Sequence, residues 1–314
     1  MTAFRTASVA FAAVLLLGAP NLPAQPLPEN LFVDKEDKSL KDPDNPTKKF
    51  RIDFARVEHM GRITREKRMQ LTPENVAGLD QEEFDQLYGS LTAGPIPEGQ
   101  YAGNLFFSKG DDVSGDGDGS TRLQEILGGL AGRAAGRGIE VLESLGRELW
   151  KGKVFFRDQR VLRNMIDDEP VIRGLTQLPH PPETRQVPRE SRLGRRFGTE
   201  TVWLLFPAKL YCGQSLVDGR RESIIVDYYY SDEIDSYRER PDSLAGRGGL
   251  RIRDEIRMIR PGFYLGRAYT NRAFLLNFTL FNEDVAKSDG PDFAGGKDIA
   301  EDCWPGEQGR KAAR

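Results

Sequence analysis

The amino-acid sequence predicts a mainly β (α+β) protein. We expect an antiparallel barrel or half-barrel of about eight strands, with a helical N-terminal arm and a helical insertion. Between residues 201 and 282, five short apolar and aromatic segments follow one another, separated by turn signals such as Asp218–Gly219. Two other stretches, 78–92 and 121–150, repeat apolar residues at helical spacing. Short antiparallel strands of this number, connected locally, close most readily into a barrel.

The first 24 residues have the pattern of a secretory signal peptide. Arg5 precedes the apolar run 9–17, and small residues follow up to Ala24. This run is too short to span a bilayer, which requires about 20 residues of helix. The alternative is an uncleaved membrane anchor. We expect cleavage after Ala24 and a periplasmic or secreted protein that has no transmembrane segment after cleavage.

A disordered leader and a helical arm are expected next. Residues 25–55 are rich in proline and charge, and they hold too few large apolar side chains to offset the entropy of ordering. The helical arm covers residues 56–98, and Asp80 and Glu83 have the spacing of a capping box at the start of a helix. We expect this helix to dock on the body of the protein through an apolar stripe made of Phe84, Leu87, Tyr88 and Leu91.

The β domain is expected over residues 99–286. Its strands are predicted at 101–107, as a pair within 151–166, and as five segments after Thr201. The helical insertion at 121–150 is interrupted by glycines, each of which costs about 1 kcal/mol in a helix interior. We therefore expect two helices with a break, or one loose helix.

The stretch before this insertion partly matches a calcium-binding loop. Asp112, Ser114 and Asp116 have the spacing of the first three ligands of such a loop. Leu123 stands where the loop requires a bidentate carboxylate, so half of the ligand set is missing. We expect a solvated linker here and no metal site.

Two more polar segments and two cysteines complete the chain. The proline- and arginine-rich stretch 175–200 is expected to be an exposed linker, and residues 287–314 a polar tail. Cys212 and Cys303 are the only cysteines, and in an oxidising compartment such a pair favours one disulfide. The alternative is two free thiols. A disulfide would attach the tail to a strand.

Charge and missing motifs exclude several functions. The formal net charge is −3, with both signs mixed along the chain, which argues against a dedicated nucleic-acid-binding protein. The two histidines, His59 and His180, lie in polar or proline-rich surroundings. The sequence has no serine in a nucleophile elbow, no clustered histidine and cysteine ligands, and no phosphate-binding glycine loop. We expect no cofactor. The sequence does not exclude an enzyme that uses only aspartate, arginine and tyrosine for proton transfer.

Strand alternation points to a candidate site. In segment 250–259, Asp254 shares a face with isoleucine and methionine, so its carboxylate must be paired or protonated, or the face must be wet. In segment 262–270, the same alternation places Arg267 among large apolar residues. If both faces point inward, the predicted ligand-binding set is Asp254, Arg267, Tyr228, Tyr230 and Tyr269. The alternatives are a structural salt bridge within the sheet, or an Arg267 that faces solvent.

Two short elements resemble the lipocalin or calycin family. Gly99 and Tyr101 are similar to the Gly-x-Trp element of that family, with tyrosine in place of tryptophan. Asp227 and Tyr228 are similar to its Thr-Asp-Tyr element. The resemblance implies a barrel with an apolar ligand cavity.

These observations leave three hypotheses about function. The first is an exported protein that binds a hydrophobic or amphipathic small molecule, such as a lipid-like acid, inside the barrel. The second is an isomerase, cyclase or lyase of the same fold, with Asp254 as acid or base and Arg267 as charge stabiliser. The third is an envelope interaction protein with a filled barrel.

Overall fold

In the computed structural model of the protein, the described residues are 26–32, 53–60, 63–106, 149–167, 183–190 and 196–307. The expected signal peptide, most of the expected leader and the calcium-like stretch lie outside these ranges. The predicted helical insertion also lies outside them, apart from its last two residues. None of the described helices is long and apolar enough to cross a membrane.

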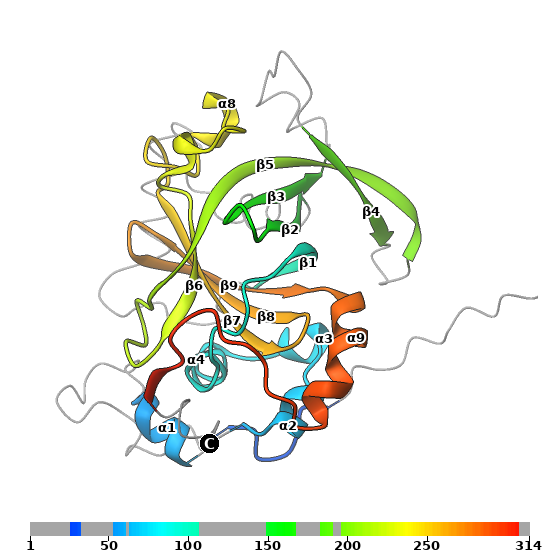
Figure 1. Ribbon diagram of the computed structural model, residues 1–314, viewed down its shortest axis with the longest axis vertical. Coiled ribbons are helices and arrows are strands. Elements are labelled where there is room, and N and C mark those ends of the chain that lie inside the picture. Colours follow the sequence, from blue (N-terminus) through cyan, green and yellow to red (C-terminus); the bar gives the residue numbers. More distant parts are fainter. Residues whose placement is uncertain are drawn as a thin grey trace, which may run out of the picture.

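A closed antiparallel barrel is the centre of the fold (Figure 1). In the described part of the chain, nine strands form one sheet in the order β3-β2-β1-β9-β8-β7-β6-β5-β4. Since β3 also pairs with β5, all strands except β4 belong to the closed ring, and the predicted barrel of about eight strands is confirmed. The strands are β1 (Gly99–Phe106), β2 (Trp150–Phe156), β3 (Val161–Asp167), β4 (Thr184–Glu190), β5 (Arg196–Gln214), β6 (Glu222–Asp227), β7 (Ile252–Arg260), β8 (Phe263–Thr270) and β9 (Ala273–Phe281).

Strand β4 corrects the prediction of an exposed linker at 175–200. Its residues pair with the first half of β5, which extends beyond the barrel. The sequence gives little sign of this strand because Pro188 and two arginines, Arg185 and Arg189, interrupt any apolar pattern. In the described sheet β4 is an edge strand, where a proline is tolerated because one row of backbone N–H groups needs no partner.

The helices lie around the barrel. In Figure 1, α1 to α4 and α9 gather in the lower half and α8 lies at the top. Residues 287–314, expected to be a polar tail, begin within helix α9, whose N-cap is Asn282. The described helices are α1 (Phe54–Met60), α2 (Arg65–Met69), α3 (Pro73–Val76), α4 (Gln81–Ser90), the 3-10 helix η4 (Ser231–Glu233), α8 (Glu239–Asp242) and α9 (Glu283–Ala294).

Helix α4 docks on the outside of the barrel, as its sequence predicts. Asp80 and Glu83 form the expected capping box. The apolar stripe of the helix packs against Ile259 of β7 and against Phe263 and Leu265 of β8. Every residue of β8 is consequently buried, because the helical arm covers the face that points away from the barrel interior.

The interior of the barrel is lined mainly by apolar side chains. On β8 the inward residues are Tyr264, Gly266 and Ala268. A Cβ atom on Gly266 would lie 2.2 Å from the ring of Phe278, so this position has to be glycine for the ring to cross the strand. The two sides of β8 therefore belong to two different cores, the barrel interior and the arm interface.

One end of the barrel is closed by two chain segments, and we call it the closed end. Ala93 and Ile96, which follow the arm, pack into the interior cluster together with Cys303. Cys303 forms a disulfide with Cys212 of β5, with 5.3 Å between their Cα atoms, as predicted. The C-terminal segment is therefore attached to the barrel wall.

Candidate functional site

Four polar side chains meet inside the barrel, and we call them the interior polar cluster. Lys153 comes from β2, Asn164 from β3, Tyr228 from the residue after β6, and Asp254 from β7. All four are buried, and each is at most 5% exposed. Neighbouring strands supply them: β2 pairs with β3, and β6 with β7.

The ammonium group of Lys153 has a full set of acceptors. Its Nζ lies 2.6 Å from the Tyr228 hydroxyl, 2.9 Å from Oδ1 of Asn164 and 3.0 Å from Oδ2 of Asp254. An ammonium has three N–H donors, so these contacts use all of them. The contact with Asp254 is also an ion pair, in which both side chains are almost fully enclosed.

Asn164 organises the other side of the cluster. Its Nδ2 donates to the Tyr228 hydroxyl at 2.9 Å and to the carbonyl oxygen of Phe206 at 3.0 Å. Its Oδ1 also accepts from the indole N–H of Trp150 at 2.9 Å. With both ends of the amide engaged, the cluster holds its polar atoms in fixed positions inside an apolar barrel.

The charges of the cluster balance each other. Burial alone would lower the pKa of the Lys153 ammonium, but the Asp254 carboxylate and Tyr228 hold that pKa above its usual value. Burial raises the pKa of the Asp254 carboxyl, and Lys153 opposes that shift. Burial also raises the pKa of Tyr228 to about 12, so its hydroxyl stays protonated at neutral pH and serves as a hydrogen-bonding group.

Aromatic rings surround the ammonium. Its Nζ lies 5.5 Å from the ring centroid of Trp150 and 5.3 Å from those of Tyr228 and Phe278. Rings at this distance attract a cation through their quadrupole, most strongly where water is excluded. The rings thus help to hold a charge in an interior that would otherwise disfavour it.

Half-buried apolar side chains lie toward the end of the barrel opposite the closed end. They come from the places where β1 leaves the barrel and where β2, β5, β7 and β9 enter it. All of them pack against the interior core while keeping part of their surface exposed. They are Leu105, Trp150, Phe206, Ile252 and Leu276.

The structure brings together only part of the predicted site. Asp254 and Tyr228 belong to the interior polar cluster, and the Tyr228 hydroxyl oxygen lies 3.4 Å from Oδ2 of Asp254. Tyr230 is 42% exposed, in the turn that follows β6, so its predicted position inside the barrel is wrong. Sequence reasoning missed Lys153 and Asn164.

The expectation that Arg267 faces the barrel interior is also wrong. Arg267 forms an ion pair with Asp85 of helix α4, and its Nε donates to the Tyr269 hydroxyl at 3.1 Å. Its guanidinium lies 4.6 Å from the ring centroid of Phe274. Arg267 and Tyr269 therefore serve the contact between the barrel and its helical arm, on the other side of the sheet from Asp254.

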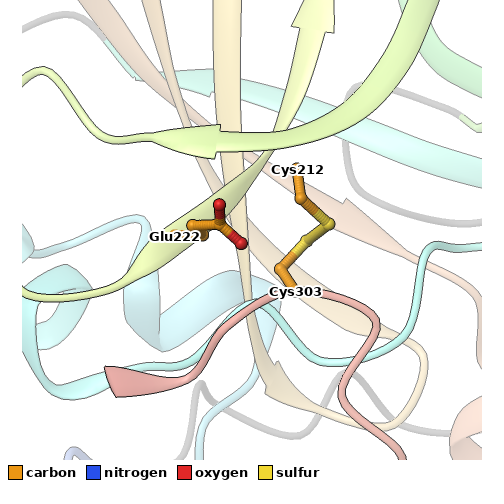
Figure 2. A group of neighbouring side chains, drawn as sticks. All are labelled: Cys212, Glu222 and Cys303. Carbon is orange, nitrogen blue, oxygen red and sulfur yellow. A yellow bond between two sulfur atoms is a disulfide. The ribbon is translucent and has the colours of Figure 1, made fainter. Parts of the chain in front are cut away.

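The disulfide has a carboxylate beside it (Figure 2). The Glu222 side chain accepts the backbone N–H of Trp304 at 2.8 Å, and its own backbone N–H donates to the Trp304 carbonyl at 3.0 Å. Cys212, Glu222 and Cys303 have the proximity of metal ligands, but the two sulfurs are bonded to each other. The trio thus serves to fasten the C-terminal segment to β5 and β6.

Comparisons with known proteins add little to this description. No family model and no curated protein matches the chain. Among solved structures, the chain is similar to a protein from Thermomonospora curvata, with 16% identity over 65% of this chain and 88% of that one. The TM-score is 0.30, at which the similarity carries no argument about fold or function.

Proposed function

We propose that the protein is an exported binding protein, which holds a hydrophobic or amphipathic small molecule in the barrel with the ligand's polar group at the interior polar cluster. The observation that carries the proposal is the enclosed Lys153–Asp254 pair, with 3.0 Å between Nζ and Oδ2. Removing two charges from water costs several kcal/mol each, and apolar residues of similar volume would fill a purely structural core at least as well. Apolar walls with a few fixed polar groups are typical of small-molecule sites.

The charge balance of the cluster narrows the class of ligand. The arginine expected to bind an acidic head group lies outside the barrel, and the charge of Lys153 is already matched by Asp254. A carboxylate ligand would add an uncompensated negative charge to this interior. A neutral hydroxyl or carbonyl group fits better, since it can accept a hydrogen bond from Lys153, and a hydroxyl can also donate one to Asp254, without changing the net charge.

Export has two lines of support. The N-terminal sequence has the pattern of a signal peptide, and the disulfide between Cys212 and Cys303 is of the kind that persists in oxidising compartments.

An enzyme of the same fold is the second candidate. The pair of Asp254 and Arg267 does not support it, because the two side chains lie on opposite sides of the sheet. Asp254 beside Lys153 and Tyr228 is an arrangement that could move a proton. Two results together would favour the enzyme. The wild type would convert a bound ligand to a product, and Asp254→Asn would still bind the ligand but no longer convert it.

Calorimetric titration with 1-dodecanol and dodecanoic acid tests the binding proposal. The two probes share an apolar chain and differ in the charge of the head group. We expect the wild type to bind dodecanol more tightly than dodecanoate. The double variant Lys153→Met/Asp254→Leu, which keeps the interior neutral, should bind dodecanol about tenfold more weakly, since a hydrogen bond or two to the head group is lost.

Lys151→Met is the matched control. Lys151 lies on the same strand, but it pairs with Asp167 and Glu200 and its side chain is 30% exposed. This variant should bind dodecanol as the wild type does. Failure of the wild type to bind either probe, or equal dodecanol binding by the wild type and the double variant, would contradict the proposal.

A further inference from the structure

A cavity lies at the closed end of the barrel, and we call it the basal pocket. Its volume is about 430 Å³, within the range of small-molecule sites. One wall is the segment 95–98, and the opposite wall is helix α9 with the residues that follow it. The apolar lining includes Tyr101, Met258, Tyr264, Phe293 and Ile299.

The charged residues around this pocket are mainly acidic. Four carboxylates line it, against the two cations Arg157 and Lys297. Both cations are engaged: Arg157 pairs with Asp302 at 2.7 Å, and Lys297 with Asp292 at 2.6 Å. The four carboxylates are Glu98, Asp289, Asp292 and Asp298.

Asp289 differs from the other carboxylates of the pocket. Asp298 pairs with Arg65, and Glu98 accepts the backbone N–H of Arg157. Asp289 accepts a hydrogen bond from the neutral hydroxyl of Ser288 at 2.7 Å, and no described cation forms an ion pair with it. Its negative charge is therefore available to a ligand.

A tyrosine hydroxyl provides an independent sign of a ligand. Tyr101 is 2% exposed, and its ring packs edge-on against Phe155 and Tyr264. No described residue hydrogen-bonds its hydroxyl, whereas the hydroxyl of Tyr264 donates to the carbonyl of Pro95 at 2.7 Å. Tyr101 lines the basal pocket together with Asp289 and Glu98. Burial, followed by these two carboxylates, raises the pKa of Tyr101.

We propose that the basal pocket binds a primary alkylammonium compound. The ammonium would lie between the Asp289 carboxylate and the Tyr101 hydroxyl, and the alkyl chain would lie along Met258, Tyr264 and Phe293. A primary ammonium carries both the charge that the carboxylates attract and the N–H donors that the tyrosine oxygen can accept. A carboxylate ligand would be repelled, and a quaternary ammonium would leave the tyrosine oxygen without a donor.

The pocket is distinct from the interior polar cluster. Tyr101 and Lys153 are opposite each other in the register of β1 and β2. Their side chains diverge, because Lys153 reaches Asp254 and Tyr228 while the Tyr101 ring lies against Tyr264 at the closed end. A ligand in one site therefore need not contact the other.

Calorimetric titration with octylammonium chloride, sodium octanoate and octyltrimethylammonium chloride tests the proposal. We expect octylammonium to bind at submillimolar concentration and the other two probes to bind at least tenfold more weakly. Tyr101→Phe and Asp289→Asn should each weaken octylammonium binding about tenfold, since each removes one contact of the head group.

Two variants serve as controls. Asp284→Asn removes an exposed carboxylate from the same helix outside the pocket, and it should leave octylammonium binding unchanged. Lys153→Met/Asp254→Leu should also bind octylammonium normally, which separates this site from the barrel interior. Three results would overturn the proposal. Octanoate could bind as tightly as octylammonium, or Tyr101→Phe and Asp289→Asn could have no effect on octylammonium binding. The third result is that octylammonium does not bind even at about 10 mM.

Discussion

Asp254→Leu is expected to destabilise the protein by about 3–5 kcal/mol, because it leaves the Lys153 ammonium buried without its counter-ion. The double variant Lys153→Met/Asp254→Leu should recover most of this loss, since an apolar pair fills the same space without a desolvation penalty. Urea denaturation of the wild type, both single variants and the double variant measures the free energy of unfolding in each case.

A second ion pair of the barrel gives the matched control. Asp167 lies 3.3 Å from Lys151, and their side chains are 19% and 30% exposed. Asp167→Leu is therefore expected to change the free energy of unfolding by at most about 1 kcal/mol. A loss below about 1 kcal/mol for Asp254→Leu would mean that water reaches the pair, contrary to the enclosed geometry.

Removal of the disulfide has an effect of similar size. Cys212 and Cys303 are 91 residues apart, and closing a loop of that length stabilises a protein by about 4.6 kcal/mol in the chain-entropy model. The variant Cys212→Ala/Cys303→Ala should lose about this much, and the segment that closes the barrel should become more accessible to proteases.

Thermal unfolding with and without a reducing agent checks this expectation. The melting temperature of the wild type should fall on reduction to near that of the double alanine variant. Reductant should have no effect on the variant itself. An unchanged melting temperature of the wild type under conditions that fully reduce the bond would contradict this account of the disulfide.

Local patterns were sufficient to predict the strands of the barrel. The C-terminal strands carry apolar and aromatic residues between clear turn signals, and helix α4 carries its own capping box. The same patterns marked Asp254 as a charge on an apolar face, which is where the structure has it. Strand β4 was missed because it depends on pairing with the long strand β5 and has little apolar pattern of its own.

The faces of β8 could not be assigned from alternation alone. Alternation separates an inner from an outer face only when one of them contacts solvent. Here helix α4 covers the outer face, so Phe263 and Leu265 are as buried as Tyr264 and Ala268. Large apolar residues on the outer face led to the wrong position for Arg267.

Lys153 was missed because a β-bulge alters the alternation of β2. Lys151 and Lys153 are two residues apart and would share a face in a regular strand. The register shifts between Trp150 and Gly152, and Gly152 has a φ of 127°, which favours glycine. Lys153 consequently points into the barrel while Lys151 stays half-exposed. A glycine inside a strand pattern was the available signal.

The most direct test of the binding proposal is an NMR measurement on the ammonium group of Lys153. In ¹⁵N-lysine-labelled protein, an enclosed and hydrogen-bonded ammonium should exchange its protons slowly enough to give a visible signal at neutral pH, and that signal should be absent from Lys153→Met. We predict that addition of dodecanol shifts this signal. If it does not move at a saturating dodecanol concentration, the barrel interior does not receive the ligand and the central claim is wrong.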